Sequence, residues 1–339
     1  MAGGGRLTFV GIGVGLAFHA ALAAQPPPPT VRSAVKPPSR ASARWAVPRT
    51  AWGHPDLQGF WNNGTATTLE RPADLADKEF LTDAEWAARA KEAATRAESR
   101  PDDPIADLTL AYGNVWWDRG APLRRTSLII DPPNGKLPPL SAEGLKLTRE
   151  REAAARLRGP ADSWEDRPLP ERCLLYHAVP PLPTGYNNNY LIAQTPQQVT
   201  IRYEMLSETR TIWVDSRPHL GSGIPQWIGN SRGRWEGDTL VVETVNYSSK
   251  THLRFFPIDY KTLRVTERFT RTSLNTIDYR FTVDNPTMYT RPWTASLPFV
   301  RVDGPIYEYA CHEGNHSLPN VLRGERHQEN LRERKDSPK

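Results

Sequence analysis

The chain has 339 residues, a length that allows one large domain or two small ones. Thirty-two prolines and a mean hydropathy of -0.59 predict much irregular chain, while eleven tryptophans supply material for a core. The formal net charge is +5 at pH 7, but no basic patch is interleaved with aromatic residues, which excludes nucleic acid as the expected partner.

The N-terminus has the features of an export signal. Arg6 provides a positive n-region, residues 7–22 form an apolar h-region, and residues 21–23 (Ala-Leu-Ala) offer small side chains for cleavage. The apolar run is too short and too glycine-rich for a typical membrane span. We therefore expect residues 1–24 to be a signal peptide and the mature protein to be periplasmic or extracellular, without a membrane span. An uncleaved membrane anchor is the alternative.

The first half of the mature chain is mostly irregular. Residues 25–50 are rich in Pro, Ala, Ser and Arg and lack periodicity, which is typical of a disordered linker. A short strand is expected within residues 54–61, which the chain enters through a proline turn. Residues 81–99 form the clearest helix, because Thr82 and Glu85 make a capping box at its start.

The second half of the chain predicts a β-rich fold. A helix is expected at residues 142–158, and from residue 190 short strands follow one another between turn signals. The expected strands are 190–194, 198–206, 210–215, 233–236, 239–247, 262–272, 276–284, 289–301 and 305–311. No helical pattern lies between them to serve a parallel crossover, which favours an antiparallel barrel or sandwich. Residues 321–339 are expected to form a charged helix or tail.

Residues 231–249 predict a β-hairpin with its turn at Gly237-Asp238. Each face of its second strand mixes apolar and polar side chains, where a plain surface strand has one apolar face. The face expected inside a barrel consists of Leu240, Val242, Thr244 and Asn246. It becomes polar toward one end, as a pocket for an amphipathic ligand requires. Glu243 then faces outward, toward the 64–188 region, and an error of one residue in the register would reverse the faces.

Export to an oxidising compartment also suggests how the two cysteines are used. Cys173 and Cys311 are the two cysteines of the chain, and two cysteines in an oxidising compartment usually pair. We expect a disulfide that ties the start of the β-rich region to its last strand. Two unrelated buried thiols are the alternative.

Several sequence motifs, spread over nearly the whole mature chain, resemble those of a known group of proteins. They are DLQGFW, RTSLIIDPPNGKLPPL, ERC, GYNNNY, IAQTP, GRWEGDTLVVET, VTERFTR, YTRPWTA and IYEYACHEGN. In these motifs the chain resembles a large group of exported bacterial proteins for which no activity is established. Gly59-x-Trp61 is also similar to the first-strand signature of lipocalins. We therefore expect residues 51–320 to form one calycin- or lipocalin-like antiparallel β-barrel domain. A helical and Pro-rich insertion at 64–188 would pack outside it or across one end.

The pattern His-Glu-Gly-Asn-His at residues 312–316 fits the zinc motif H-E-x-x-H. That motif requires a helix, so that both imidazoles project from one face onto the metal. Here Gly-Asn occupies its middle positions, where helix propensity is poor. A zinc-dependent hydrolase built on His312 and His316 is therefore a distant alternative. We expect polar groups at the end of a strand, where His312 and Glu313 suit the mouth of a ligand site.

Glu267 lies on the apolar face of its strand, where a carboxylate is costly unless it is paired. Burial would raise its pKa and an arginine partner would lower it. Arg291 is the candidate partner, because Tyr289, Arg291 and Trp293 share one face of another expected strand. Glu267 is thus either an acid/base group or ligand anchor, or one half of a structural Arg–Glu pair.

Two further stretches carry side chains suited to a polar ligand. Asp215, Arg217 and His219 lie on one proline-restricted loop, followed by Trp227, and histidine titrates near neutral pH. Residues 186–190 (Tyr-Asn-Asn-Asn-Tyr) add amides and phenols. Solvated turns would have the same composition.

The sequence therefore predicts an exported binding protein for a small amphipathic or aromatic molecule. The expected ligand contacts are Tyr186, Asn189, Asp215, Arg217, Trp227, Asn246, Tyr289, Arg291, Trp293 and Glu313. The alternative is a cofactor-independent isomerase, lyase or hydrolase that uses Glu267, His219 or His312, and in it Glu267→Gln would abolish turnover and leave the fold intact. No P-loop and no G-x-G-x-x-G after a strand supports a nucleotide cofactor, and no nucleophile elbow between a strand and a helix supports covalent serine chemistry.

Overall fold

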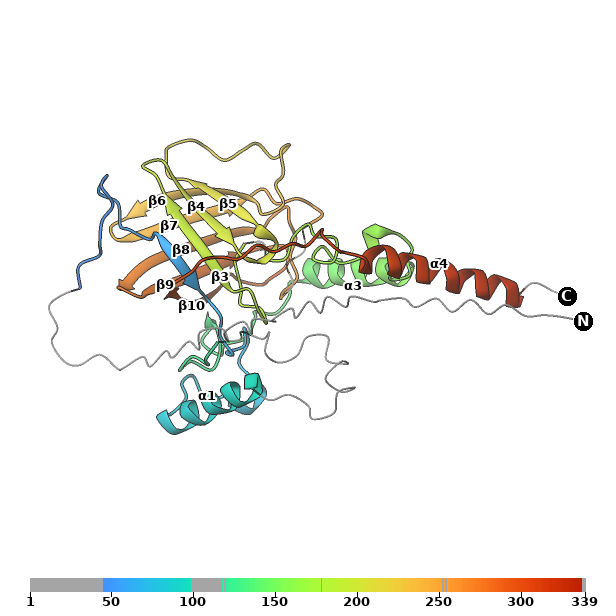
Figure 1. The fold of residues 1–339 in the computed structure, drawn as a ribbon, viewed down its shortest axis with the longest axis horizontal. Helices are drawn as coiled ribbons and strands as arrows, with labels where there is room; N and C mark the ends of the chain where they lie inside the picture. The colour runs from blue at the N-terminus through green and yellow to red at the C-terminus, as the bar shows by residue number, and fades with distance from the viewer. Residues whose placement is uncertain are drawn as a thin grey trace, which may run out of the picture. The chain divides into compact units, whose positions relative to one another are not determined.

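The computed structural model describes residues 45–98, 118, 120–177, 179–251, 253 and 255–336, all within one compact unit. Nine of the described strands close into a barrel (Figure 1). In their order around the barrel they are β1 (Gly59–Asn62), β3 (Asn189–Gln194), β4 (Gln198–Tyr203), β5 (Thr209–Trp213), β6 (Asn230–Glu236), β7 (Thr239–Val245), β8 (Arg264–Ser273), β9 (Thr276–Asp284) and β10 (Trp293–Val302). The expected signal peptide and most of the expected linker lie outside the described residues.

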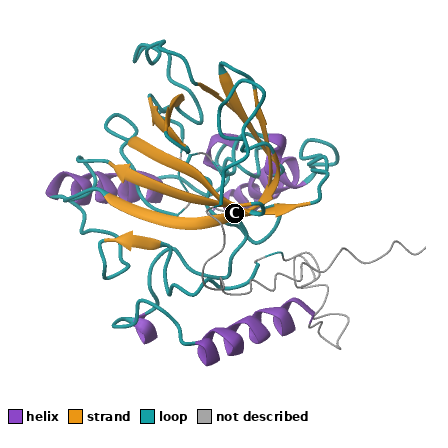
Figure 2. Ribbon diagram, turned by 90° about the vertical axis from the view of Figure 1, so that its left-hand side faces the viewer, coloured by secondary structure: helices purple, strands orange, loops and turns teal. Residues whose placement is uncertain are grey.

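Strand β1 closes the barrel, because it pairs antiparallel with β3 on one side and with β10 on the other. Phe60 lies opposite Leu191 of β3 and Val302 of β10. The short strand β2 (Ile129–Asp131) adds to β10. The contact between β5 and β6 is parallel, and the other pairings are antiparallel. The prediction of a mainly antiparallel β-barrel is therefore confirmed, and Figure 2 shows the strands curving round a common interior.

Alternation along the strands fills this interior with large side chains. Residues of β8 and β9 are buried at every second position, as a barrel with one inward face requires. The largest buried aromatic side chains are Trp61, Tyr190, Tyr203, Tyr247, Phe269, Tyr279, Phe281, Trp293 and Phe299. They form one continuous core with aliphatic neighbours from β3, β4, β7 and β10. The inside of the barrel is therefore the hydrophobic core of the protein.

The β6–β7 hairpin confirms the register expected from its alternation. Leu240, Val242 and Thr244 are fully buried, and the turn contains Gly237 with a φ of +59°. Asn246 was wrongly placed inside. It follows the end of β7 with a φ of 61°, so the alternation has already stopped there. Its Nδ2 instead donates to the carbonyl oxygens of Gly221 (3.1 Å) and Ile224 (2.8 Å).

The described part of the chain also contains three α-helices, α1 (Asp83–Glu98), α3 (Ala142–Arg156) and α4 (Ser317–Asp336). The first two were predicted close to these bounds, and the third begins just before the expected C-terminal helix. None of the described helices is both long and apolar enough to cross a membrane. The strand expected at 305–311 was wrong, because that stretch is irregular. Closure of the barrel pairs both edges of β10, which leaves no edge there for a further strand.

The capping box of α1 predicts how this helix responds to acid. The Thr82 N–H donates to Glu85 Oε2 over 2.8 Å, and the Glu85 N–H donates to Thr82 Oγ1 over 3.3 Å. The hydrogen bond from Lys78, followed by those from Thr82, lowers the pKa of Glu85 from 4.5 to about 2. A carboxyl with a lowered folded-state pKa stabilises the fold above its unfolded pKa, and this contribution is lost as the pH falls from about 4.5 to about 2.

Glu85→Gln should therefore remove part of the acid sensitivity of the protein. The measurement is the melting temperature of the wild type and of Glu85→Gln at pH 6 and at pH 3. We expect the difference between the two pH values to be smaller for the variant. Glu152→Gln, at an exposed position of α3, is the control for a change of net charge. Equal acid sensitivity in wild type and Glu85→Gln would refute the prediction.

Candidate functional site

A charged pair lies inside the barrel. The side chains of Arg210 on β5 and Glu267 on β8 are 1% and 0% exposed. Arg210 Nη1 donates to Glu267 Oε1 over 3.0 Å, and Nη2 donates to Oε2. The Tyr279 hydroxyl donates to Oε1 over 2.9 Å. Both carboxylate oxygens are therefore satisfied, as a buried charge requires.

Two hydroxyl side chains complete this network. Arg210 Nε donates to Ser231 Oγ, and Arg210 Nη2 donates to Thr244 Oγ1, each over 2.8 Å. Burial disfavours the charged guanidinium, but the charge and hydrogen bonds of Glu267 prevail and raise the pKa of Arg210 above its usual range. The arginine therefore stays charged inside the core.

Tyrosine side chains lie close to this pair. Burial raises the pKa values of Tyr203, Tyr247 and Tyr279, and the charge of Glu267 adds to the effect. The pKa of Tyr190 is raised as well, first by burial and then by the neighbouring Tyr203. The phenols consequently remain neutral at physiological pH. The cluster supplies aromatic packing and hydroxyl groups, not phenolate anions.

Arg291 was wrongly predicted as the partner of Glu267. Its Nη2 lies on the outside, where it donates to both carboxylate oxygens of Asp131 over 2.8 Å. The reason is that β10 begins at Trp293, so that Arg291 precedes the strand and does not follow its alternation. Glu267 does face inward as expected, and its geometry is that of the structural Arg–Glu pair that the sequence left as the alternative.

Three other predicted ligand residues lie in or along the core. Trp293 and Tyr289 are 0% and 3% exposed, and the Tyr289 hydroxyl donates to the carbonyl oxygen of Pro257 over 3.0 Å. Burial raises the pKa of Tyr289. Asn189 accepts a hydrogen bond from Asn62 over 2.8 Å and donates to Glu204. These side chains connect neighbouring parts of the barrel.

His219 occupies the outer face of the barrel, away from Glu267. Its Nδ1 lies 3.1 Å from Asn230 Oδ1, and its Nε2 lies 3.1 Å from Glu243 Oε1. The Leu220 N–H donates to the same Asn230 oxygen over 2.9 Å, which identifies that atom as an acceptor. Both ring nitrogens thus lie within hydrogen-bond distance of side-chain oxygens.

Glu243 has a second partner, the guanidinium of Arg264. Burial raises the pKa of Glu243, but the hydrogen bond and charge of Arg264 prevail and lower it. Glu243 therefore faces outward as expected, and its partners among the described residues are His219, in the loop after β5, and Arg264 on β8. These contacts attach the loop between β5 and β6 to the outer face of the sheet.

The remaining residues of that connection are largely solvated. Arg217 pairs with Asp215 two positions before it, and its guanidinium lies 3.8 Å from the centre of the Trp213 ring. Trp227 is 38% exposed, and its carbonyl oxygen accepts a hydrogen bond from Thr251 over 2.7 Å. Asp215 and Arg217 therefore have the geometry of a solvated turn, which was the alternative to a polar ligand site.

A hollow of about 500 Å³ lies beside the disulfide. It is lined by Pro170, Glu171, Tyr186, Asn187, Glu308, Tyr309, Ala310, Cys311, Glu313, Gly314, Asn315 and Ser317. Two predicted ligand residues, Tyr186 and Glu313, meet here although 127 positions separate them along the chain. Two tyrosines and three glutamates give the lining both apolar and acidic character.

The walls of this hollow are tied together covalently and by hydrogen bonds. Cys173 and Cys311 form the predicted disulfide. Asn315 Nδ2 donates to the Glu171 carbonyl oxygen over 3.0 Å, while its Oδ1 accepts from Ser317 Oγ over 2.9 Å at the start of α4. One asparagine therefore joins the two walls and caps the helix.

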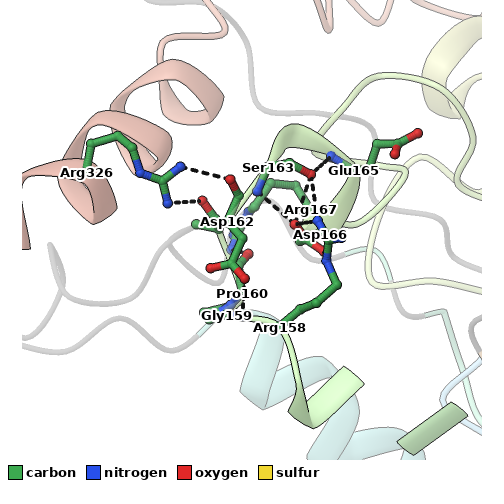
Figure 3. Close-up of polar contacts among 10 residues, drawn as sticks. Arg158, Gly159, Pro160, Asp162, Ser163, Glu165, Asp166, Arg167 and Arg326 are labelled. Carbon is green, nitrogen blue, oxygen red and sulfur yellow. Dashed lines mark hydrogen bonds and ion pairs between the residues drawn. The ribbon is translucent and has the colours of Figure 1, made fainter. Parts of the chain in front are cut away.

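A cluster of polar contacts joins helix α4 to the segment that precedes Glu171 (Figure 3). Arg326 of α4 donates to the carbonyl oxygens of Ala161 (3.1 Å) and Asp162 (2.8 Å). Arg158 binds Asp166 through Nε and Nη2, and these interactions hold the pKa of Asp166 well below its usual range. Helix α4 and the segment that leads to Glu171 are thus bonded to each other.

The H-E-x-x-H pattern does not lie on a helix. Residues 312–316 form a turn, and α4 begins at Ser317. His312 and His316 are both exposed and do not line the hollow. Among the described residues, no group of three or more His, Cys, Asp or Glu side chains is placed to hold a metal ion.

The sequence reasoning missed Glu171, Glu308 and Tyr309 as lining residues. A signal was available, because Glu171 lies two positions before Cys173, and Glu308 and Tyr309 lie close before Cys311. Once the two cysteines are expected to pair, the residues beside them are expected to meet. Comparisons of the chain with protein-family models, curated proteins and solved structures give no match, so function has to be argued from this geometry.

Proposed function

We propose that the protein is an exported β-barrel that binds a small amphipathic or aromatic molecule, and that the hollow beside Cys311 is the binding site. The observation that carries the proposal is the meeting of Tyr186 and Glu313 in one concave, 500 Å³ space. Sites for small molecules are typically concave, with apolar walls and a few polar groups that orient the ligand.

The composition of the lining supports this ligand class. Tyr186 and Tyr309 provide apolar area and hydroxyl groups, and Glu308 and Glu313 provide exposed carboxylates. A ligand with an aromatic or aliphatic body and a hydrogen-bond donor would use both kinds of group. The disulfide supports an oxidising compartment, since disulfides persist mainly in exported proteins.

The packing of the barrel argues for this outer site over the interior. Arg210 and Glu267 satisfy each other inside, and the surrounding aromatic side chains form the core. The three candidate catalytic residues also lie in different places. Glu267 is inside the barrel, His219 lies on its outer face against Glu243, and His312 is exposed beside the disulfide. Binding is therefore favoured over catalysis.

Native mass spectrometry of the oxidised, exported protein is the first test, because it identifies a retained small molecule. The affinity for that molecule is then compared with Tyr186→Ala and Glu313→Gln variants. We expect each change to weaken binding by about tenfold or more, since each removes a direct contact. Tyr307→Ala is the matched control, because Tyr307 is 68% exposed and does not line the hollow. Equal affinity in all variants would place the ligand elsewhere.

A further inference from the structure

A second hollow, of about 400 Å³, lies on the outer surface of the barrel. It is lined by Leu123, Arg124, Arg125, Thr272, Thr276, Asp278, Arg280, Ser296, Leu297 and Pro298. These residues come from the segment before β2 and from strands β8, β9 and β10. The two sides are therefore far apart in sequence and are brought together by the fold.

The lining is basic and rich in hydroxyl groups. Arg124, Arg125 and Arg280 face a single acidic residue of the lining, Asp278. Threonine and serine side chains of β8, β9 and β10 add hydroxyl donors. Guanidinium and hydroxyl groups together are the donor set that binds carboxylate, sulfate and phosphate oxygens.

Two of the guanidinium groups are held in place by aromatic rings. Arg124 lies 4.6 Å from the ring centre of Trp86, and Arg125 lies 4.6 Å from that of Phe80. Stacking of this kind restricts a long side chain without using its N–H groups. The arginines consequently keep donors available while their orientation is limited.

The existing ion pairs leave most of these donors unused. Among the described residues, Arg124 bonds to Asp83 and Arg125 bonds to Glu79, each through Nη1 alone. Arg280 bonds to Asp278 through Nε. The Asp83 and Glu79 side chains are 94% and 51% exposed, and exposed ion pairs contribute little free energy. An anion in the hollow can therefore compete with these partners.

We propose that this hollow is an anion site that takes an oxyanion group, either a phosphate or sulfate or a carboxylate, through Arg125 and Arg280. An oxyanion in the hollow would accept charge-assisted hydrogen bonds from these guanidinium groups. The site is separate from the hollow beside Cys311 and does not depend on the function proposed for that hollow.

The test is calorimetric titration of the full mature protein with inorganic phosphate at constant ionic strength set by chloride. We expect saturable binding, weakened about tenfold or more by Arg125→Gln and by Arg280→Gln. Arg234→Gln is the matched control, because Arg234 lies on β6, pairs with Glu236 and does not line the hollow. Unchanged melting temperatures would show that the variants remain folded.

A variant that is expected to bind phosphate more tightly distinguishes an anion site from a purely structural role of these arginines. Glu79→Gln removes the competing partner of Arg125 and should tighten phosphate binding. Titrations with sulfate and acetate then distinguish the source, since preference for phosphate and sulfate indicates tetrahedral oxyanions and equal binding of acetate indicates carboxylates. No saturable binding of any of the three anions, or equal weakening by Arg234→Gln, would overturn the proposal.

Discussion

Glu267→Gln should lower the free energy of unfolding by about 3–5 kcal/mol, the usual cost of removing one partner from a buried ion pair. The change leaves the charge of Arg210 without a counter-ion in a core where its side chain is 1% exposed. It also replaces the carboxylate that accepts a hydrogen bond from the Tyr279 hydroxyl with a neutral amide. Urea unfolding followed by tryptophan fluorescence measures the effect. The sequence alone allowed a different outcome, in which Glu267→Gln spares the fold and abolishes turnover.

Two controls distinguish the buried pair from a general effect of charge. Replacing both partners, as Arg210→Met with Glu267→Leu, removes the uncompensated charge and should recover much of the lost stability. Glu236→Gln breaks ion pairs with Arg234 and Arg268 on the surface and should cost much less stability than Glu267→Gln. A Glu267→Gln protein as stable as the wild type would contradict the structural role of the pair.

Replacing Cys173 and Cys311 by serine should produce the second large loss, of about 5 kcal/mol. The disulfide joins residues 138 positions apart, and in the chain-entropy model a loop of this length restricts the unfolded chain strongly. The bond also joins the two walls of the hollow, so we expect the double variant to lose affinity for the ligand retained there. The measurements are urea unfolding and ligand titration of the oxidised wild type and of the double variant.

The barrel provides the internal control for this experiment. Its closure depends on pairing between strands, which the disulfide does not join. The near-ultraviolet circular dichroism of the folded double variant should therefore keep the signal of buried Trp61 and Trp293. A double variant that unfolds at the wild-type urea concentration and binds the ligand equally well would refute both parts of the prediction. Loss of affinity without loss of stability would support a local role for the disulfide.

Patterns along the chain were sufficient to predict the features that depend on neighbouring residues. Alternation identified the strands and the inward face of β7 at Leu240, Val242 and Thr244. The capping box of Thr82 and Glu85 identified the start of α1, because its partners lie within one helical turn. The number of cysteines and the expected compartment identified the disulfide. Each of these inferences needed no knowledge of which strands are adjacent.

The contacts between distant groups depend on how the strands are ordered in space. Glu267 was recognised as needing an arginine, but its partner is Arg210 on β5, because strand order and barrel closure determine which inward side chains face one another. The irregular stretch 305–311 has the composition of a strand, yet the closed barrel leaves no edge for it. Both hollows arise where loops and insertions fold onto the barrel, and pattern along the chain does not specify such contacts. Local hydrogen bonding and periodicity act over a few residues, while burial and charge pairing act through space, and for this reason the site emerged only from the fold.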